Sequence, residues 1–228
     1  MGAIDDKVVV TEYFNAKGFD RWRRIYGDGD VNFVQKYIRI GHQRTIDTVV
    51  GWLQADGNLA ELTVCDAGCG VGSLSLPLAQ AGATVSASDI STKMVGEARE
   101  RAQAAGVAID YNVQDLEKLT GTYHTAICLD VLIHYPETEI ERMISHLADR
   151  ARTRLIVSFA PKTPRLSALK KIGEFFPGPS KTTRAYQHRE IDIIEILMAR
   201  GFAIGRKTLT SAPFYFAQLL EATRIEAL

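Results

Sequence analysis

The sequence is poor in cysteine and carries no excess of charge of either sign. Its three cysteines, Cys65, Cys69 and Cys128, lack the spacing of a disulfide framework and are too few for a structural zinc site. The 27 Lys and Arg residues are matched by 27 Asp and Glu residues. This balance argues against a nucleic-acid partner, because non-specific nucleic-acid binders rely on a positive field. We therefore expect a protein of the reducing cytoplasm without a metal ion of its own.

Long apolar runs are also missing. No stretch approaches the roughly 20 apolar residues of a membrane-spanning helix, and residues 1–6 have no apolar signal-peptide core. The hydrophobic fraction of 46% over 228 residues is nevertheless enough for a buried core in one domain. The chain is thus expected to be globular, with no membrane span.

The spacing of apolar residues indicates alternating strands and helices. Helices are expected near 5–27, 32–55, 73–81, 91–105, 137–150 and 190–200, and strands near 62–66, 83–88, 107–113, 125–129, 154–159, 203–209 and 214–220. This alternation is typical of a parallel sheet that has helices on both faces. The prediction is an α/β fold with a doubly wound, mostly parallel seven-stranded sheet.

Four regions follow from this pattern. Residues 1–57 are expected to form an N-terminal helical arm, 58–160 a ligand-binding core, 161–189 a cap inserted after the fifth strand, and 190–228 the C-terminal part of the core sheet. The insertion is rich in proline and basic residues and has a single acid, Glu174. Its basic side chains are Lys162, Arg165, Lys170, Lys171, Lys181, Arg184 and Arg189.

A glycine-rich turn follows the first predicted strand. Asp66-Ala67-Gly68-Cys69-Gly70-Val71-Gly72 has glycines that let the backbone approach a ligand closely. The third glycine of the dinucleotide fingerprint is replaced by Ser73. A tight corner between a strand and a helix would give the same letters, so the turn alone does not identify the ligand.

Acidic residues narrow the choice of ligand. Asp66, Asp89, Asp115 and Asp130 lie at or just after the ends of four successive strands, where parallel sheets bind ligands. Such carboxylates would repel a pyrophosphate but suit a cation that also offers hydroxyl and amino donors, such as S-adenosylmethionine. This pattern over residues 62–160 resembles the class I methyltransferase family, which has a Rossmann-like fold.

The resemblance implies a set of cofactor-binding residues. Asp66 would face the methionine end of the cofactor, Asp89 the ribose hydroxyls and Asp115 the adenine amino group. Arg39 matches an arginine that reaches the cofactor carboxylate in quinone-precursor O-methyltransferases; the alternative is an exposed helical arginine. The full implied set is Arg39, Asp66, Gly68, Cys69, Gly70, Gly72, Asp89, Ile90, Met94, Asp115, Leu116 and Leu129.

The segment after the fourth strand bears on the methyl acceptor. The segment 129–136 lacks the Asn/Asp-Pro-Pro-aromatic element of many N-methyltransferases and places His134 in an apolar setting, which favours an oxygen acceptor. Nearly the whole chain then resembles a narrower family, the magnesium-protoporphyrin IX O-methyltransferases of chlorophyll biosynthesis. The resemblance rests on residues 19–29, 65–73, 129–136, 158–163 and 177–186.

This second resemblance implies methyl transfer to a propionate carboxylate of the macrocycle, giving the monomethyl ester. We expect Tyr26 and His134 to position the substrate, with His134 also a candidate base; packing of the arm is the alternative role of Tyr26. Magnesium would arrive only within the substrate, where His42 or His188 is a candidate axial ligand. The basic cap would attract the second propionate, and Phe175, Phe176, Tyr186 and Phe214 would offer flat apolar surface.

The family also implies contact with the porphyrin-binding subunit of magnesium chelatase and peripheral attachment to photosynthetic membranes; the residues themselves point to neither. Two other functions remain open at this stage. An O-methyltransferase of a quinone precursor would leave the basic insertion unexplained, and a non-catalytic porphyrin or cofactor carrier would bind ligands without turnover. An RNA methyltransferase is disfavoured by the zero net charge.

Overall fold

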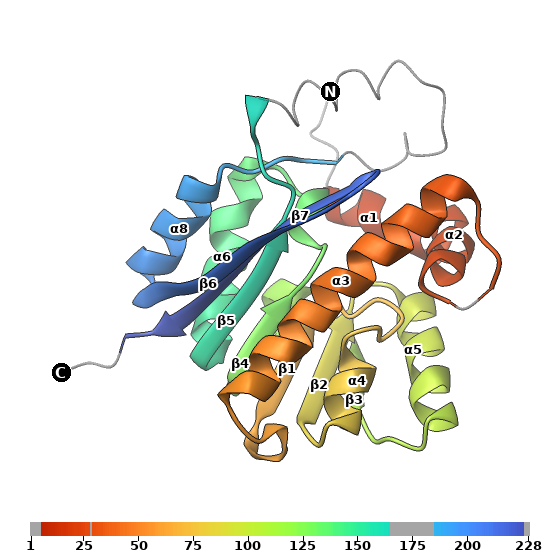
Figure 1. Cartoon of the computed structure of the whole chain (residues 1–228), viewed down its shortest axis with the longest axis horizontal. Helices are drawn as coiled ribbons and strands as arrows, with labels where there is room; N and C mark the ends of the chain where they lie inside the picture. Colours follow the sequence, from red (N-terminus) through yellow and green to blue (C-terminus); the bar gives the residue numbers. More distant parts are fainter. Residues whose placement is uncertain (1–5, 28, 165–184, 226–228) are drawn as a thin grey trace.

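The structure is a computed structural model that describes residues 6–27, 29–164 and 185–225. It opens with three helices, α1 (Asp6–Asn15), α2 (Lys17–Tyr26) and α3 (Phe33–Asp56). Helix α3 begins at a capping box, in which Asn32 and Gln35 each accept a hydrogen bond from the other's backbone N–H. In Figure 1, α1 and α2 lie beside the N-terminal half of α3.

Seven strands of the described chain form one sheet in the order β3-β2-β1-β4-β5-β7-β6. Strands β1 to β5 pair in parallel, whereas β7 runs antiparallel to both β5 and β6. The predicted doubly wound, mostly parallel sheet is therefore confirmed. The strands are β1 (Thr63–Ala67), β2 (Thr84–Asp89), β3 (Asp110–Val113), β4 (Tyr123–Cys128), β5 (Ala151–Phe159), β6 (Phe202–Ala212) and β7 (Tyr215–Arg224).

Helices cover both faces of the sheet (Figure 1). Helices α3, α4 (Ser75–Gln80) and α5 (Thr92–Ala104) cover one face, and α6 (Glu137–Arg150) and α8 (Glu190–Ala199) cover the other. Three short 3₁₀ helices, η1 (Leu59–Glu61), η2 (Leu116–Lys118) and η3 (Leu132–His134), lie in the connections. The central strand β4 serves both cores, because successive side chains of a strand point to opposite faces: Ala126 and Cys128 join one core and Ile127 the other.

Most of the predicted insertion at 161–189 lies outside the described residues, and so do Phe175, Phe176 and five of its basic side chains. The two C-terminal strands form a tight hairpin, in which Phe214 adopts a positive φ of 65°. In the part of the chain that the structure describes, no helix has the length and apolar character needed to cross a membrane.

Two glycines of α3 give a matched test of the packing between α3 and β7. A Cβ added at Gly41 would lie 2.3 Å from the Tyr215 ring, whereas a Cβ at Gly51 would meet nothing within 4 Å. We expect Gly41→Ala to lower the free energy of unfolding by about 1–3 kcal/mol, because the partly buried Tyr215 ring must move. Gly51→Ala should raise it by up to about 1 kcal/mol through helix propensity.

Urea unfolding of the two variants beside the parent chain measures both effects. Equal stabilities of the two variants would contradict the close approach of α3 to Tyr215.

Candidate functional site

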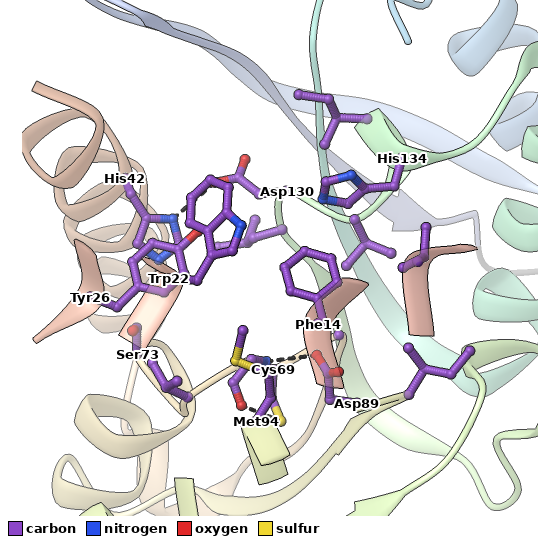
Figure 2. Close-up of a pocket in the computed structure, with 18 of the residues that line it drawn as sticks. Phe14, Trp22, Tyr26, His42, Cys69, Ser73, Asp89, Met94, Asp130 and His134 are labelled. Carbon is purple, nitrogen blue, oxygen red and sulfur yellow. Dashed lines mark hydrogen bonds and ion pairs between the residues drawn. The ribbon is translucent and has the colours of Figure 1, made fainter. Parts of the chain in front are cut away.

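A cavity of about 320 Å³ lies at the carboxyl ends of β1, β2 and β4, within the range of small-molecule sites. Helices α1 and α2 form its outer wall through Val10, Tyr13, Phe14, Trp22 and Tyr26. Figure 2 shows Trp22 and Tyr26 on one side of the cavity and His134 on the other. The cavity is therefore bounded jointly by the sheet edge and by the helical arm.

Most of the predicted site residues line this cavity. They are Tyr26, Gly68, Cys69, Gly70, Asp89, Ile90, Met94, Asp115, Leu116, Leu129 and His134. Arg39, Asp66 and Gly72 are described by the structure but are not part of the lining.

The loop after β1 needs glycine for specific reasons. Gly68 and Gly70 adopt positive φ angles of 84° and 53°, which side chains rarely tolerate. A Cβ at Gly68 would lie 2.1 Å from the Val131 side chain, whereas Gly70 has open space beside it. Gly72 also has a positive φ, of 78°, and it packs against Tyr111, whose hydroxyl would lie 2.5 Å from an added Cβ. The first two glycines line the cavity, and the third lets the loop pack closely against Tyr111 of β3.

Asp89 connects the end of β2 to this loop. Its Oδ2 accepts a hydrogen bond from the Gly70 N–H at 2.9 Å, and its Oδ1 accepts one from the Ser91 N–H at 2.8 Å. Burial raises the pKa of Asp89, and the backbone hydrogen bonds oppose this rise. In Figure 2 the carboxylate lies at the floor of the cavity beside Cys69 and Met94. It is placed to accept hydrogen bonds from a ligand with hydroxyl groups.

Two other strand-end acids are engaged within the protein. Asp66 is buried behind the glycine loop, where it accepts a hydrogen bond from the Ser75 hydroxyl, and burial raises its pKa to about 6. Asp115 lines the cavity, accepts a hydrogen bond from the Glu117 N–H and pairs with Lys7 of α1 at 2.6 Å. The predicted contacts of these two acids with a cofactor stay predictions.

Arg39 lies at the junction of α2 and α3. Its guanidinium donates hydrogen bonds of 2.8 Å to the carbonyl oxygens of Arg24, Ile25 and Gly29. Two of these carbonyl groups, those of Arg24 and Ile25, belong to the last turn of α2, where carbonyl groups lack partners within the helix. In this structure Arg39 therefore holds the arm against α3 and does not face the cavity.

Tyr26 and His134 face the cavity from opposite walls (Figure 2). The Tyr26 ring stacks on Trp22 with centroids 5.3 Å apart, and its other neighbour is His42 at 4.3 Å. His134 contacts the edge of Phe14 at 5.3 Å. Burial lowers the pKa of His134 to about 4 and, with the nearby Asp130 carboxylate, raises the pKa of Tyr26. Both side chains are consequently uncharged at neutral pH.

Asp130 was predicted only as a strand-end acid, and the polar cluster that it forms was not predicted from the sequence. Its Oδ2 accepts hydrogen bonds from His42 at 2.9 Å and from the Tyr215 hydroxyl at 2.8 Å, and its Oδ1 accepts one from Ser158 at 3.1 Å. Asp130 also adopts a positive φ of 56°. Its position at a strand end was the only sequence signal, because its partners are distant in the sequence.

His188, the other candidate axial ligand, is buried against the Leu132 carbonyl and is not part of the lining.

The strand order with an antiparallel β7, the glycine loop after β1 and the acid at the end of β2 define the class of the protein. It is a class I S-adenosylmethionine-dependent methyltransferase. Two family comparisons agree: "Methyltransferase domain" matches residues 64–153, and "Magnesium-protoporphyrin IX methyltransferase C-terminus" matches residues 128–224.

Individual proteins narrow the class further. The chain is 65% identical to the magnesium-protoporphyrin O-methyltransferase of Synechocystis sp., over 97% of this chain and 98% of that protein. It is 55% identical to the chloroplastic magnesium protoporphyrin IX methyltransferase of Arabidopsis thaliana, over 95% and 71% respectively. A crystal structure of the Synechocystis PCC 6803 enzyme with bound SAH superposes with a TM-score of 0.89 at 62% identity, covering 97% of this chain and 100% of that one. The chain belongs to the magnesium-protoporphyrin O-methyltransferase family.

Asp89 gives a first test of the site. We expect Asp89→Ala to weaken binding of S-adenosylhomocysteine by about 1–3 kcal/mol, because a hydrogen-bonding partner of the ligand is lost. Isothermal titration calorimetry measures this change. Asp110→Ala is the matched control, because Asp110 is exposed at the start of β3, whereas the cavity lies at the carboxyl ends of the strands. Parental affinity in Asp89→Ala would mean that the ribose is bound elsewhere.

The pH dependence of stability tests the setting of His134. Its pKa falls from 6.5 in the unfolded chain to about 4 in the folded protein, so below pH 6.5 the unfolded chain binds a proton that the folded protein does not. Stability should therefore fall as the pH decreases through this window. Relative to His134→Gln, the parent chain should lose roughly 2 kcal/mol between pH 7.5 and 5.0.

Urea unfolding at the two pH values measures this difference, and the other titrating groups cancel because both proteins contain them. A stability difference that does not change with pH would place His134 in contact with solvent.

Proposed function

We propose that this protein transfers the methyl group of S-adenosylmethionine to a propionate carboxylate of magnesium-protoporphyrin IX, giving the monomethyl ester. Family membership over nearly the full chain carries this proposal. The cavity supports it independently, because it joins the glycine loop and Asp89 to a second wall that carries Tyr26 and His134. One cavity thus offers a place for the methyl donor and a place for its acceptor.

In this proposal the cofactor occupies the sheet edge. The backbone of 68–70 approaches the methionine part, Asp89 accepts hydrogen bonds from the ribose and Asp115 accepts one from the adenine amino group. Apolar contacts with the adenosine come from Ile90, Met94, Leu116 and Leu129, all of which line the cavity. Asp66, Gly72 and Arg39 lie outside the cavity lining: Asp66 is bonded to Ser75, Gly72 packs against Tyr111, and Arg39 holds the arm.

The chemistry is a direct displacement: the carboxylate oxygen bonds to the methyl carbon while the carbon–sulfur bond breaks and its electron pair returns to sulfur. A propionate with a pKa near 4.3 is already ionised at neutral pH, so the protein's main task is to position it. Holding two reactants in near-attack geometry is itself a large source of rate acceleration.

Tyr26 and His134 are suited to this positioning role. The Tyr26 hydroxyl keeps its proton because burial and Asp130 raise its pKa, so it can donate a hydrogen bond to a carboxylate. His134, with a pKa lowered to about 4, stays neutral and can donate from one ring nitrogen. A neutral donor orients the carboxylate without forming an ion pair that would weaken its nucleophilicity. The low pKa also makes His134 a weak base, which favours orientation as its role.

The proposal also covers a partner protein, membrane attachment and the insertion at 161–189. We infer from the family that the protein contacts the porphyrin-binding subunit of magnesium chelatase and attaches peripherally to photosynthetic membranes. The insertion at 161–189 would cover the macrocycle and attract its second propionate. Apart from this membrane attachment, we infer that the protein works in the cytoplasm.

A turnover assay tests the proposal directly. The protein is incubated with S-adenosylmethionine and magnesium-protoporphyrin IX, and a catechol-type quinone precursor is assayed in parallel; ester formation is followed by mass spectrometry. We expect the monomethyl ester from the porphyrin and no product from the catechol. Product from the catechol alone, or binding of both ligands without turnover, would overturn the proposal.

Variants locate the acceptor wall in the same assay. His134→Ala should lower kcat about 100-fold, the scale expected when a reactant is misplaced, while the affinity for S-adenosylhomocysteine stays close to that of the parent. His146→Ala is the matched control, because His146 lies on α6 and contacts the Leu119 carbonyl outside the cavity. Parental turnover in His134→Ala would remove this residue from the site.

A further inference from the structure

The cavity contains a histidine whose orientation is fixed by a carboxylate. His42 projects from α3 into the cavity, and its Nδ1 lies 2.9 Å from Asp130 Oδ2. Its side chain is 13% exposed. Asp130 cannot swing away easily, because Tyr215 and Ser158 also hold its carboxylate. Figure 2 shows the contact between His42 and Asp130 behind the Trp22 ring.

This contact determines which ring nitrogen is available. An ionised carboxylate only accepts hydrogen bonds, so Nδ1 must carry a proton, and a neutral ring then has its lone pair on Nε2. No hydrogen bond from the described residues reaches Nε2, and this atom is not among the enclosed polar atoms that lack a partner. In its neutral form His42 therefore presents at the cavity a lone pair that no described residue uses.

We propose that His42 Nε2 is the axial ligand of the magnesium ion in the porphyrin substrate, with Asp130 as the group that fixes the ring. This inference rests on the proposed function. The macrocycle supplies four nitrogen ligands in one plane and leaves axial positions, so the lone pair of Nε2 replaces an axial water without any redox step. Histidines that bind metals typically donate their other N–H to a carboxylate or carbonyl oxygen, and the pair of His42 and Asp130 has this arrangement.

Neighbouring aromatic rings fit the same occupant. The Tyr26 ring meets His42 at a centroid distance of 4.3 Å and an interplanar angle of 34°. The two rings are tilted against one another, and the Nε2 lone pair points along the plane of the His42 ring. Phe214 also lines the cavity, is 58% exposed and contacts the edge of Phe33 at 6.3 Å. Exposed aromatic surface beside a cavity suits a large flat apolar ligand.

His134 is the other histidine of the cavity lining, and it differs from His42 in one respect. Its enclosed Nδ1 has no hydrogen-bond partner among the described residues, so no carboxylate fixes its tautomer. His134 is thus free to orient the propionate while His42 binds the metal. The two histidines would recognise different parts of one substrate.

The test compares magnesium-protoporphyrin IX with metal-free protoporphyrin IX. Both are titrated into the parent chain and into His42→Ala with saturating S-adenosylhomocysteine, and binding is followed by the shift of the porphyrin absorption bands. We expect His42→Ala to weaken binding of the magnesium porphyrin about 10–100-fold and that of the metal-free porphyrin less than threefold. Added imidazole should restore the absorption spectrum of the bound magnesium porphyrin.

Further variants keep the test decisive. Asp130→Asn should weaken binding of the magnesium porphyrin about 10-fold, because it removes the charged partner of Nδ1. His42→Gln retains a polar group toward Asp130 without an imidazole, so it should resemble His42→Ala if the protein remains folded by circular dichroism. His146→Ala, outside the cavity, should bind both porphyrins like the parent.

Two results would overturn the inference. An equal loss of affinity for both porphyrins in His42→Ala would assign His42 to packing, and a loss of affinity for S-adenosylhomocysteine alone would assign it to the cofactor. The parent chain separates these results from failure of the proposed function. If the parent forms the ester and His42→Ala keeps its preference for the magnesium porphyrin, only this inference fails; if the parent neither binds nor methylates that porphyrin, both fail.

Discussion

The site depends on how the loop after β1 is attached to the end of β2. Strands β1 and β2 pair in parallel up to Ala67 and Ser88. Beyond that point the N–H groups of Gly68 and Cys69 both donate to the Ser88 carbonyl, at 2.7 and 2.9 Å. The Gly70 N–H then donates to the Asp89 carboxylate. The loop that borders the cavity is therefore an extension of the strand ladder, and hydrogen bonds to β2 hold its shape.

The opposite wall of the cavity is attached in a different way. Asn15 Oδ1 accepts hydrogen bonds from the Ser91 hydroxyl and the Lys93 N–H, and the Tyr26 carbonyl accepts one from Arg101. Lys7 adds ion pairs to the η2 region. Such individual polar contacts near the surface contribute little each, so they can separate one at a time. The arm is thus attached by side-chain contacts, whereas the loop after β1 is attached mainly through backbone N–H groups.

The predictable part of the site is the part that follows from local pattern. Strand periodicity located the carboxyl ends, and Gly68 and Gly70 were recognisable because their turn requires positive φ angles. Asp89 followed from its position at the end of β2. In these cases the residue that carries the chemistry lies within a few residues of the strand end that places it. The sequence alone therefore shows both the residue and its place in the fold.

The rest of the site depends on contacts between segments that are distant in the sequence. The spacing of apolar residues predicts the helices and strands but does not show which segments meet. Arg39 has a position in the sequence that matches a cofactor-binding arginine, yet its guanidinium reaches carbonyl groups of the preceding helix. The partners of Asp130 come from α3, β5 and β7. A strand-end acid could be predicted to face a ligand, but only the packed fold shows that this one is occupied by three side chains.

The charges of the site also follow from packing. Burial keeps His134 and Tyr26 uncharged at neutral pH, so the two side chains proposed to hold the acceptor are neutral. In the proposed reaction the carboxylate takes the methyl group of the sulfonium, so one negative and one positive charge disappear as the ester and the thioether form. Electrostatic interactions are stronger in a cavity with little water than in bulk water, and neutral side chains do not compete for either reactant. The enclosed Nδ1 of His134, which has no partner among the described residues, therefore makes sense as a group that orients a substrate, while the Asp130 carboxylate is held by His42, Tyr215 and Ser158.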